Sequence, residues 1–432
     1  MAAEQTRRAI EAVFRIERPR LIGGLARMLR DLDAAEELAQ DAFLAALTDW
    51  TPGGIPQNPG AWLMTTARRR AIDALRRARM QEEKHAQLGA EPSPAPPFAQ
   101  IEDIEAALGD PVGDERLALI FAACHPLLPA PARAALTLRL LGGLTTQEIG
   151  RAFLVPEATI AQRIVRAKRT LGEAGIAFEL PAACELPQRL ASVLEVIYLI
   201  FNEGYAATAG TDLLRPALCQ EAQRLGRVLA GLMPQEPEVL GLLALMELQA
   251  SRLRARVAAD GSAVPIPQQN RARWDQLLIR RGLAALARSQ ALGGTSGPYV
   301  LQAAIAACHA QAPRFEDTDW PRIAAIYDAL ARELPSPIVG LNRAVAHSMA
   351  FGPEAGLRLL DEIADAPALE GHALLAAARG DCLLRAGRTA EARTAFERAA
   401  VLTQNARERQ FLLGRAAACG EALPLSARIC RP

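Results

Sequence analysis

The stretch from Thr145 to Leu171, TTQEIGRAFLVPEATIAQRIVRAKRTL, predicts two short helices joined by a tight turn. Thr145 and Glu148 have the three-residue spacing of a capping box, which marks the N-terminus of the first helix. Residues 154–155 break the apolar periodicity, and Pro156 restarts it as a proline in the first turn of the second helix. The sequence therefore indicates a helix-turn-helix in the first half of the chain.

The second predicted helix has two chemically different faces. At 100° per residue, one face is apolar and the opposite face offers cations and hydrogen-bonding groups. The apolar face carries Ile160, Ile164, Ala167 and Leu171, and the opposite face carries Ala158, Gln162, Val165, Arg166 and Arg169. Such a helix suits the major groove of DNA, although a solvated surface helix has the same pattern.

The composition favours a helical protein of several domains. The chain has 432 residues, 50% of them hydrophobic, and a net charge of +1. This length exceeds one ordinary core, so two to four domains are expected. Alanine and leucine dominate and β-branched runs are few, which favours helices. The net charge alone argues neither for nor against a nucleic-acid partner, because the distribution of charge matters more.

The cysteines predict neither disulfides nor a metal site. Seven cysteines are scattered without a CxxC pair, as is typical of buried, reduced thiols. Cys124-His125 and Cys308-His309 are adjacent pairs, but neighbours on a helix point about 100° apart and rarely share a metal.

The N-terminus has no apolar signal core, and no run reaches the roughly 18 apolar residues of a membrane span. We expect a cytoplasmic protein without a metal or another cofactor.

An acidic helix is predicted to begin at Asp33, as its N-cap, and to run to about Asp49. Between Asp31 and Ala67 there are six acids and no bases. The exposed side of the helix carries Glu36, Glu37 and Asp41, near Gln40. These side chains form either a solvated face that complements the helix N-terminus or a docking face for a basic partner.

A turn-rich loop and a basic helix follow. Residues 51–60 read TPGGIPQNPG, and Asn58 is expected to cap a helix with Pro59 in its first turn. Residues 62–80 contain six arginines and one acid. The face opposite the apolar stripe includes Arg69, Arg70, Arg76 and Arg77. Guanidinium groups at helical spacing suit phosphate contacts, and the loop could reach unstacked bases; an arginine-rich solvated helix is the alternative.

The rest of the chain divides into a linker and a large helical part. Residues 81–116 are rich in Pro and Ala and carry a net charge of −7, which predicts a linker with at most a short helix around Ile101, Ile104 and Leu108. Helices of mixed charge are expected after Pro181. Gly380, Ala392, Phe396 and Ala399 stand at tetratricopeptide-like offsets. Stacked helix pairs of this kind generally form a concave surface for a peptide or protein.

Taken in order, these motifs resemble a bacterial RNA polymerase sigma factor of the extracytoplasmic-function type. DAAEELAQDAFLAAL looks like the polymerase-docking helix of that family, and NPGAWLMTTARRRAIDALRR looks like its −10 segment. LTTQEIGRAFLVPEATIAQRIVRAKRTL is similar to its −35 reader. The resemblance covers residues 8–176. SVLEVIYLIFNEGYAAT, residues 192–208, looks like the junction segment of a subgroup that carries tetratricopeptide-like repeats.

The resemblance implies an all-α protein with two small helical promoter-binding domains, the second a helix-turn-helix, and a larger C-terminal domain of α/α helical repeats. It assigns residues 1–85 to sigma region 2, 86–112 to an acidic linker, 113–180 to sigma region 4 and 181–432 to the repeats. It implies no enzymatic activity. The expected partners are core RNA polymerase, the −35 duplex and −10 non-template strand of promoter DNA, and a protein or peptide bound by the repeats, with no membrane partner.

The resemblance also implies a role for each set of side chains. Glu36, Glu37, Gln40 and Asp41 would dock on polymerase. Asn58, Trp62, Arg69, Arg70, Arg76 and Arg77 would hold the −10 strand. Thr159, Gln162, Arg163, Arg166 and Arg169 would contact the −35 groove. The chain departs from the family pattern at Leu154 and Ala158, where Gly is common, and at Ala161-Gln162, where a basic and a small polar residue are common. The −35 sequence preference therefore does not carry over.

Three other classes of function fit parts of the sequence. A helix-turn-helix regulator with a tetratricopeptide-like sensor domain would leave the −10-like helix and its loop unexplained. An enzyme in the C-terminal half would use the polar cluster Asn202, Glu203 and Tyr205, but no nucleophile–base or metal pattern accompanies that cluster. A purely structural scaffold would leave all three ordered motifs unexplained.

Overall fold

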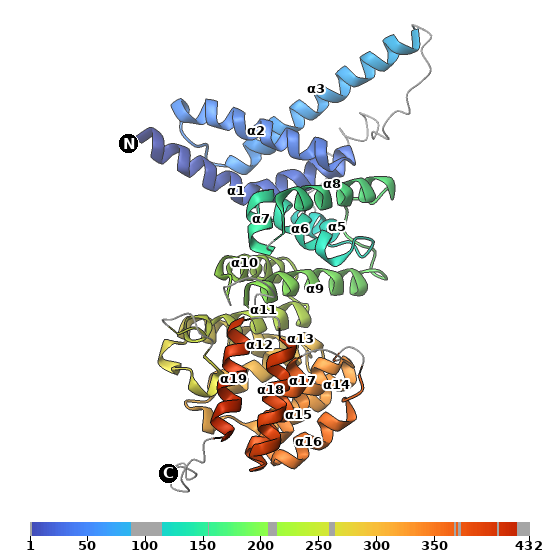
Figure 1. The fold of residues 1–432 in the computed structure, drawn as a ribbon. Coiled ribbons are helices and arrows are strands. Elements are labelled where there is room, and N and C mark those ends of the chain that lie inside the picture. The colour runs from blue at the N-terminus through green and yellow to red at the C-terminus, as the bar shows by residue number, and fades with distance from the viewer. Residues whose placement is uncertain are drawn as a thin grey trace. The chain divides into compact units, whose positions relative to one another are not determined.

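The computed structural model describes residues 2–87, 115–153, 155–205, 214–258, 264–366, 369, 373–403 and 406–420. Within these ranges the regular elements are helices, which confirms the predicted all-α class (Figure 1). The chain forms two compact units, Met1–Ile200 and Phe201–Pro432, and the boundary falls inside helix α9 (Leu186–Tyr205). Among the described helices, none combines the length and the apolar sequence that a membrane span requires.

The first unit begins with α1 (Ala2–Leu29), α2 (Leu32–Gly53) and α3 (Pro59–Gln87), which pack on one another. α1 continues through Pro19, although a proline inside a helix costs about 3 kcal/mol. Phe14 and Leu21, on either side of it, are buried. Burial of each such side chain contributes about 1.5–3 kcal/mol, so the packing of α1 outweighs the cost of the proline.

The start of α2 differs from the prediction. Asp31, and not Asp33, is the N-cap: its carboxylate accepts hydrogen bonds from the backbone N–H groups of Asp33 at 2.8 Å and Ala34 at 3.1 Å. The helix begins two residues earlier because Leu32 is buried and must already face the core. The side chain of Asp33 is therefore not used for capping.

The predicted cap of α3 is confirmed. The backbone N–H of Ala61 donates to the side-chain oxygen of Asn58 at 3.1 Å, and Pro59 is the first helical residue. α3 runs to Gln87, beyond the predicted end at residue 80. Residues 81–87 of the predicted linker are therefore helical, and residues 115–116 already belong to the helix Glu115–Ala123. The remainder, residues 88–114, lies outside the described residues, as does the short helix proposed around Ile101.

The predicted helix-turn-helix is present in the last part of the first unit. This part contains α5 (Glu115–Ala123), α6 (Ala130–Leu140), α7 (Thr146–Phe153) and α8 (Glu157–Glu173), and α7 and α8 form the helix-turn-helix. The capping box is confirmed in both directions, because the N–H of Thr145 donates to Glu148 Oε2 at 2.8 Å and the N–H of Glu148 donates to Thr145 Oγ1 at 3.1 Å. Pro156 is the N-cap of α8 and stands one residue before the predicted position.

A close contact of backbones fixes the turn between α7 and α8. A Cβ atom on Gly150 would lie 2.7 Å from the carbonyl oxygen of Val155, so only glycine allows this approach. The buried face of α8 is the predicted one, formed by Ile160, Ile164, Ala167 and Leu171. The opposite face of α8 is consequently turned toward solvent.

The second unit is built from helices that pack largely against their neighbours in sequence. They are α10 (Pro216–Leu232), α11 (Pro237–Ala250), α12 (Gln276–Ala291), α13 (Pro298–Gln311), α14 (Trp320–Glu333), α15 (Pro337–Phe351), α16 (Pro353–Glu362), α17 (Ala373–Arg385), α18 (Thr389–Leu402) and α19 (Ala406–Gly420). Short 3-10 turns occupy Leu253–Ala255, Ile266–Gln268, Arg271–Arg273 and Phe315–Asp317.

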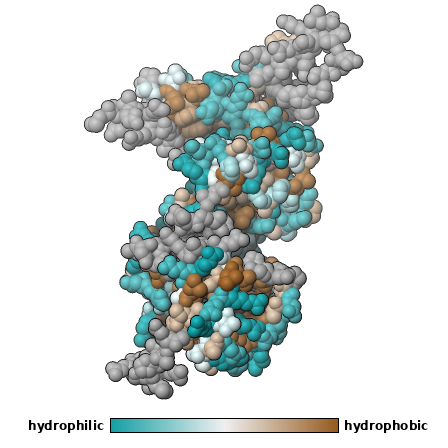
Figure 2. Space-filling view, in the orientation of Figure 1, coloured by the Kyte–Doolittle hydropathy of each residue, from teal (hydrophilic) through white to brown (hydrophobic). Residues whose placement is uncertain are grey.

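The tetratricopeptide-like offsets correspond to a packed helix pair. Phe396 of α18 is buried, and a Cβ atom on Gly380 of α17 would lie 2.8 Å from its ring. Ala392 and Ala399 are buried in the same core. Gly380 on α17 thus admits the aromatic ring of Phe396 on α18. Figure 2 shows that hydrophilic residues cover much of the visible surface around these cores.

Candidate nucleic-acid interface

The exposed face of α8 contains the residues predicted to contact the −35 groove. Gln162 and Arg166 are exposed, and Thr159 and Arg163 are half-buried at the edge of this face. Arg169 is also exposed and forms an ion pair at 3.4 Å with the exposed Glu173. An exposed pair of this kind contributes little stability, so the guanidinium can exchange its partner for a phosphate at small cost.

Val165 adds an apolar group to the same face. Its side chain is 64% exposed, between Gln162 and Arg169 along the helix. An exposed branched side chain costs free energy in water, whereas the major groove offers it the methyl group of thymine. The helical spacing placed Val165 on this face, but the sequence analysis did not include it among the site residues.

The loop before α3 and the outer side of α3 are open to solvent. Gly54, Ile55, Gln57 and Asn58 are exposed in the loop, although the side-chain oxygen of Asn58 already caps α3. Trp62 is half-buried and meets the buried Trp50 of α2 edge to face, with 5.1 Å between ring centroids. Trp62 thus joins α3 to α2 and also presents a partly accessible ring beside the loop.

The arginines of α3 divide into different roles. Arg69 and Arg76 are exposed, and the side chain of Arg77 lies outside the described part of the structure. Arg70 pairs with Asp41 of α2 at 3.2 Å, and both side chains remain more than 40% exposed. This pair links two predicted sites, the basic face of α3 and the acidic face of α2.

The four predicted docking residues of α2 are not equivalent. Glu37 and Gln40 are exposed, and Asp41 is half-buried beside Arg70. Gln40 also lines a cavity of about 330 Å³ between α1, α2 and the end of α6. Glu36 differs from the other three, because only 14% of its side chain is exposed.

Glu36 lies in a cluster of cations. Its carboxylate is 2.5 Å from Nζ of Lys168, 2.7 Å from Nη2 of Arg18 and 3.6 Å from Nε of Arg139. The ammonium of Lys168 also lies 2.6 Å from Asp33. Burial lowers the pKa of Lys168, but the hydrogen bonds to Asp33 and Glu36 outweigh it and leave the pKa above its ordinary value. The residues involved are distant in sequence, so no local pattern predicts this cluster.

The first half of α9 packs on α5 and α6. The buried guanidinium of Arg133 donates to Ser192 and lies 3.0 Å from Glu195, and Ser192 donates to the carbonyl oxygen of Cys124 at 2.5 Å. Arg189 donates to the carbonyl oxygen of Phe121 at 2.9 Å. The helix-turn-helix part therefore takes structural support from residues beyond the predicted boundary at 180.

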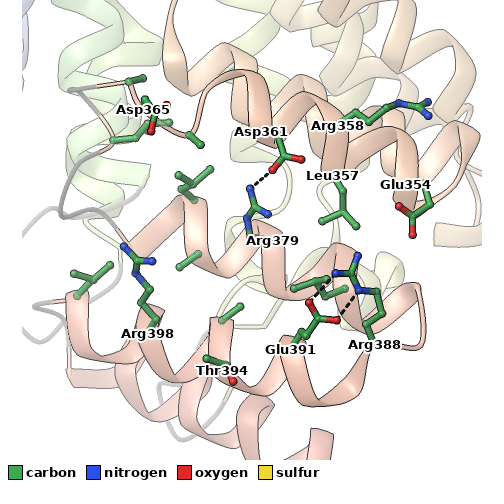
Figure 3. Close-up of a pocket in the computed structure, with 18 residues that line it drawn as sticks. Glu354, Leu357, Arg358, Asp361, Asp365, Arg379, Arg388, Glu391, Thr394 and Arg398 are labelled. Atoms are coloured by element: carbon green, nitrogen blue, oxygen red, sulfur yellow. Dashed lines mark hydrogen bonds and ion pairs between the residues drawn. The ribbon is translucent and has the colours of Figure 1, made fainter.

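In the second unit, α16, α17 and α18 line a groove of about 1030 Å³ (Figure 3). Its walls mix acids and arginines with apolar side chains. Arg379 pairs with Asp361, and Arg388 makes two hydrogen bonds of 2.7 Å to Glu391. Arg358 and Arg398 also line the groove, which therefore offers apolar contacts together with charges of both signs.

The polar cluster considered as an enzyme site is used for internal contacts. Glu203 pairs with Arg215, and Tyr205 lies under the guanidinium of Arg256 at 3.6 Å. Among the described residues, no three His, Cys, Asp or Glu side chains are grouped as a metal site would require. Burial raises the pKa of the Cys124 thiol to about 11, which makes it a poor nucleophile.

Comparison with protein families agrees with this arrangement. Residues 13–80 match Sigma-70 region 2, and residues 118–171 match Sigma-70, region 4. Residues 189–290 match a family of unknown function, DUF6596. The two sigma matches contain the acidic helix, the loop, the basic helix and the helix-turn-helix.

Similar proteins extend these matches. An uncharacterized protein of Rhizobium meliloti (strain 1021) is 43% identical over 403 residues, which cover 91% of this chain and 92% of the relative. The ECF RNA polymerase sigma factor SigK of Mycobacterium sp. (strain KMS) is 31% identical over 166 residues, 38% of this chain and 80% of the relative. SigK of Mycobacterium ulcerans (strain Agy99) is 31% identical over 159 residues, 35% of this chain and 78% of the relative. No solved structure matches the chain.

Proposed function

The chain belongs to the extracytoplasmic-function (ECF) family of RNA polymerase sigma factors, and we propose that its α2, α3 and α8 surfaces dock core polymerase and read a promoter. Region 2 is assigned to residues 1–85 and region 4 to residues 113–180, with residues 86–112 between them and residues 181–432 as the C-terminal part. The observation that carries the proposal is the pair of exposed basic faces, on α3 and α8, each on a helix with a buried opposite side.

α8 would enter the major groove of the −35 element. Its N-terminal residues would approach the base edges, and Gln162 offers the amide that pairs with adenine in two hydrogen bonds. Arg163 and Arg166 would contact bases or phosphates, and Arg169 would contact the phosphate backbone. Val165 would lie against a thymine methyl group. The exposure of these side chains supports this orientation.

α3 and its loop would hold the −10 strand. The exposed loop at residues 54–58 would take up an unstacked base, at a cost of a few kcal/mol in lost stacking. Contacts in the loop, the partly accessible ring of Trp62 and the cations on α3 would offset that cost. Arg69, Arg70, Arg76 and Arg77 would neutralise phosphates and make the complex sensitive to salt.

Docking on core polymerase would use the acidic face of α2. Glu37 and Gln40 are exposed, and Asp41 becomes available when Arg70 turns to DNA. A basic surface on the polymerase would be steered to these acids by charge complementarity. The double substitution Glu37→Lys and Asp41→Lys should then abolish co-purification with core polymerase. Unchanged co-purification would contradict the docking role.

Run-off transcription with purified core polymerase tests the function as a whole. A sigma factor should confer initiation at a specific start site, whereas a helix-turn-helix regulator should bind DNA without conferring it. A promoter library supplies the templates, because Ala161-Gln162 departs from the family pattern and the −35 preference does not carry over. Absence of initiation from every template, together with absence of core binding, would overturn the proposal.

The C-terminal part would support the active arrangement and take a protein or peptide in the groove between α16 and α18. The contacts of α9 with α5 and α6 favour support over inhibition, because its removal leaves Arg133 without its partners. Run-off transcription by the full chain should therefore exceed that by residues 1–180. Higher transcription by the shorter chain would indicate inhibition instead.

The groove is tested separately. Arg398→Glu should weaken the binding of a protein or peptide partner in the groove. In the absence of that partner, the substitution should leave promoter binding unchanged.

A further inference from the structure

Region 4 holds two of the acids at the start of the docking helix. Lys168 of α8 lies 2.6 Å from Asp33 and 2.5 Å from Glu36 of α2. Arg18 of α1 donates to the carbonyl oxygen of Arg139 at 2.8 Å, at the C-terminal end of α6. We call this set of polar contacts, which joins region 2 to region 4, the latch. Lys168 is 10% exposed at its side chain, so the ammonium is held inside the contact.

A second contact joins the same two regions without relying on charge alone. A Cβ atom on Gly23 of α1 would lie 2.2 Å from the carbonyl oxygen of Glu115, the first residue of α5. The buried carboxylate of Glu115 lies 3.4 Å from Arg20 and 3.7 Å from Arg68. α5 therefore approaches α1 as closely as two backbones allow, and any side chain at position 23 would push them apart.

The space beside the latch is not filled. The cavity of about 330 Å³ is lined by Arg18, Gln40, Phe43 and Arg139, among others. This hollow is partly open to solvent, so the boundary between the two regions beside it is not a continuous apolar core. Two regions joined by buried ion pairs can separate at a smaller cost than two halves of one apolar core, because the charged groups regain water when the regions part.

We propose that the latch is an autoinhibitory contact, in which region 4 occupies part of the polymerase-docking surface until core polymerase displaces it. Lys168 and Arg139 take the place of the basic partner at Glu36, which is the one predicted docking residue that the latch covers, and Lys168 also pairs with Asp33 beside it. This proposal rests on the docking role given to α2 above. The exposed face of α8 stays open in the latched state, whereas Asp33 and Glu36 of α2 are paired with region 4.

Promoter geometry requires the same opening. Two elements centred about 25 base pairs apart are separated by roughly 85 Å of duplex at about 3.4 Å per base pair. Ion pairs of 2.5 to 2.6 Å hold α8 against α2 and fix the separation of the two proposed DNA-binding surfaces, which we expect to be shorter than this span. The active state is thus unlatched. The apparent affinity for core polymerase falls as the latched fraction rises, because only the unlatched fraction can bind.

Carbodiimide coupling in the full-length protein tests the contact directly. This reagent joins an amine to a carboxylate only when the two touch, and the chain has just two lysines, Lys84 and Lys168. We expect a Lys168–Glu36 or Lys168–Asp33 cross-link, identified by mass spectrometry, that decreases when core polymerase is added before the reagent. A missing cross-link, or one that core polymerase leaves unchanged, would overturn the proposal.

Binding kinetics test the inhibition. Lys168→Gln removes the cation of the latch that pairs with both Asp33 and Glu36, and it should raise the association rate with core polymerase by about three- to tenfold, in the absence of DNA. Arg151→Gln removes the same charge from the exposed surface of α7 and should leave the rate unchanged. Gly23→Ala opens the α1–α5 contact without changing a charge and should also raise the rate. Circular dichroism checks that each variant is as helical as the wild type.

The outcomes separate this proposal from the docking function. If the wild type binds core polymerase and neither Lys168→Gln nor Gly23→Ala binds faster, the latch does not inhibit and only this proposal fails. If the wild type does not bind core polymerase at all, the docking function fails and the latch proposal falls with it. Faster binding by both variants, together with the cross-link, supports the proposal.

Discussion

At the scale of single residues, the exposed side chains of α8 differ in what they can recognise. In the proposed complex, Gln162 pairs with one base, whereas Arg169 contacts phosphate. We expect Gln162→Ala to lose about 1–3 kcal/mol of discrimination at one −35 position. Arg169→Ala should weaken all sites by a similar factor and reduce the salt dependence. Competition binding with a set of single-base variants measures both, and equal loss at every site for Gln162→Ala would contradict its role in base reading.

His309 makes the stability of the second unit depend on pH. Burial, and then the nearby charges of Arg252 and Arg271, lower its pKa to about 4 from an ordinary value of about 6.5. Between these values the unfolded chain binds a proton at this site that the folded chain does not. The free energy of unfolding should therefore fall as the pH drops from about 6.5 toward 4, by up to about 3 kcal/mol.

Urea denaturation at pH 7 and at pH 5 measures this effect. His309→Gln keeps a polar side chain but removes the titration, so the loss of stability between the two pH values should be smaller than in the wild type. An identical loss in both proteins would show that other groups govern the acid sensitivity.

At the scale of elements, the turn between α7 and α8 depends on one glycine. Gly150→Ala places a Cβ atom 2.7 Å from the carbonyl oxygen of Val155, so the two helices must shift apart. We expect a loss of about 1–3 kcal/mol in stability, which thermal unfolding measures. Weaker −35 binding should accompany it, since the orientation of α8 follows this turn.

Gly172, near the end of α8, is the matched control. A Cβ atom there meets no other atom within 4 Å. Gly172→Ala should therefore stabilise the helix by up to about 0.5–1 kcal/mol, because alanine restricts the unfolded chain. If the two substitutions had the same effect, the close approach at Gly150 would not be what fixes the turn.

At the scale of the whole molecule, α9 determines where the chain can be divided. Its first half supplies Ser192 and Glu195 to the buried Arg133 of α6. A chain of residues 1–180 lacks α9, so Arg133 loses its contacts with Ser192 and Glu195 and α6 loses the helix packed against it. We expect its thermal midpoint to lie roughly 5–10 °C below that of residues 1–200, from a loss of a few kcal/mol. Equal midpoints would show that α9 is dispensable for region 4.

The local features of the fold could be predicted from the sequence. Asn58 and the Thr145–Glu148 box cap their helices as expected, because capping uses atoms within a few residues of one another. The apolar spacing of α8 likewise predicted its buried face, and with it the exposed positions of Gln162 and Arg166. The order of the three motifs then indicated the family.

Contacts between residues distant in sequence could not be predicted in this way. Asp33 is not the cap of α2 but a partner of Lys168, and Glu36 turns from the expected docking face into the same ion pairs. Ser192 of α9, which binds Arg133 of region 4, also lies beyond the predicted domain boundary at residue 180. Periodicity and capping express short-range constraints, so the sequence by itself determined the helices, their faces and the family. Only the tertiary structure decided which charged groups meet, because that depends on how the helices pack.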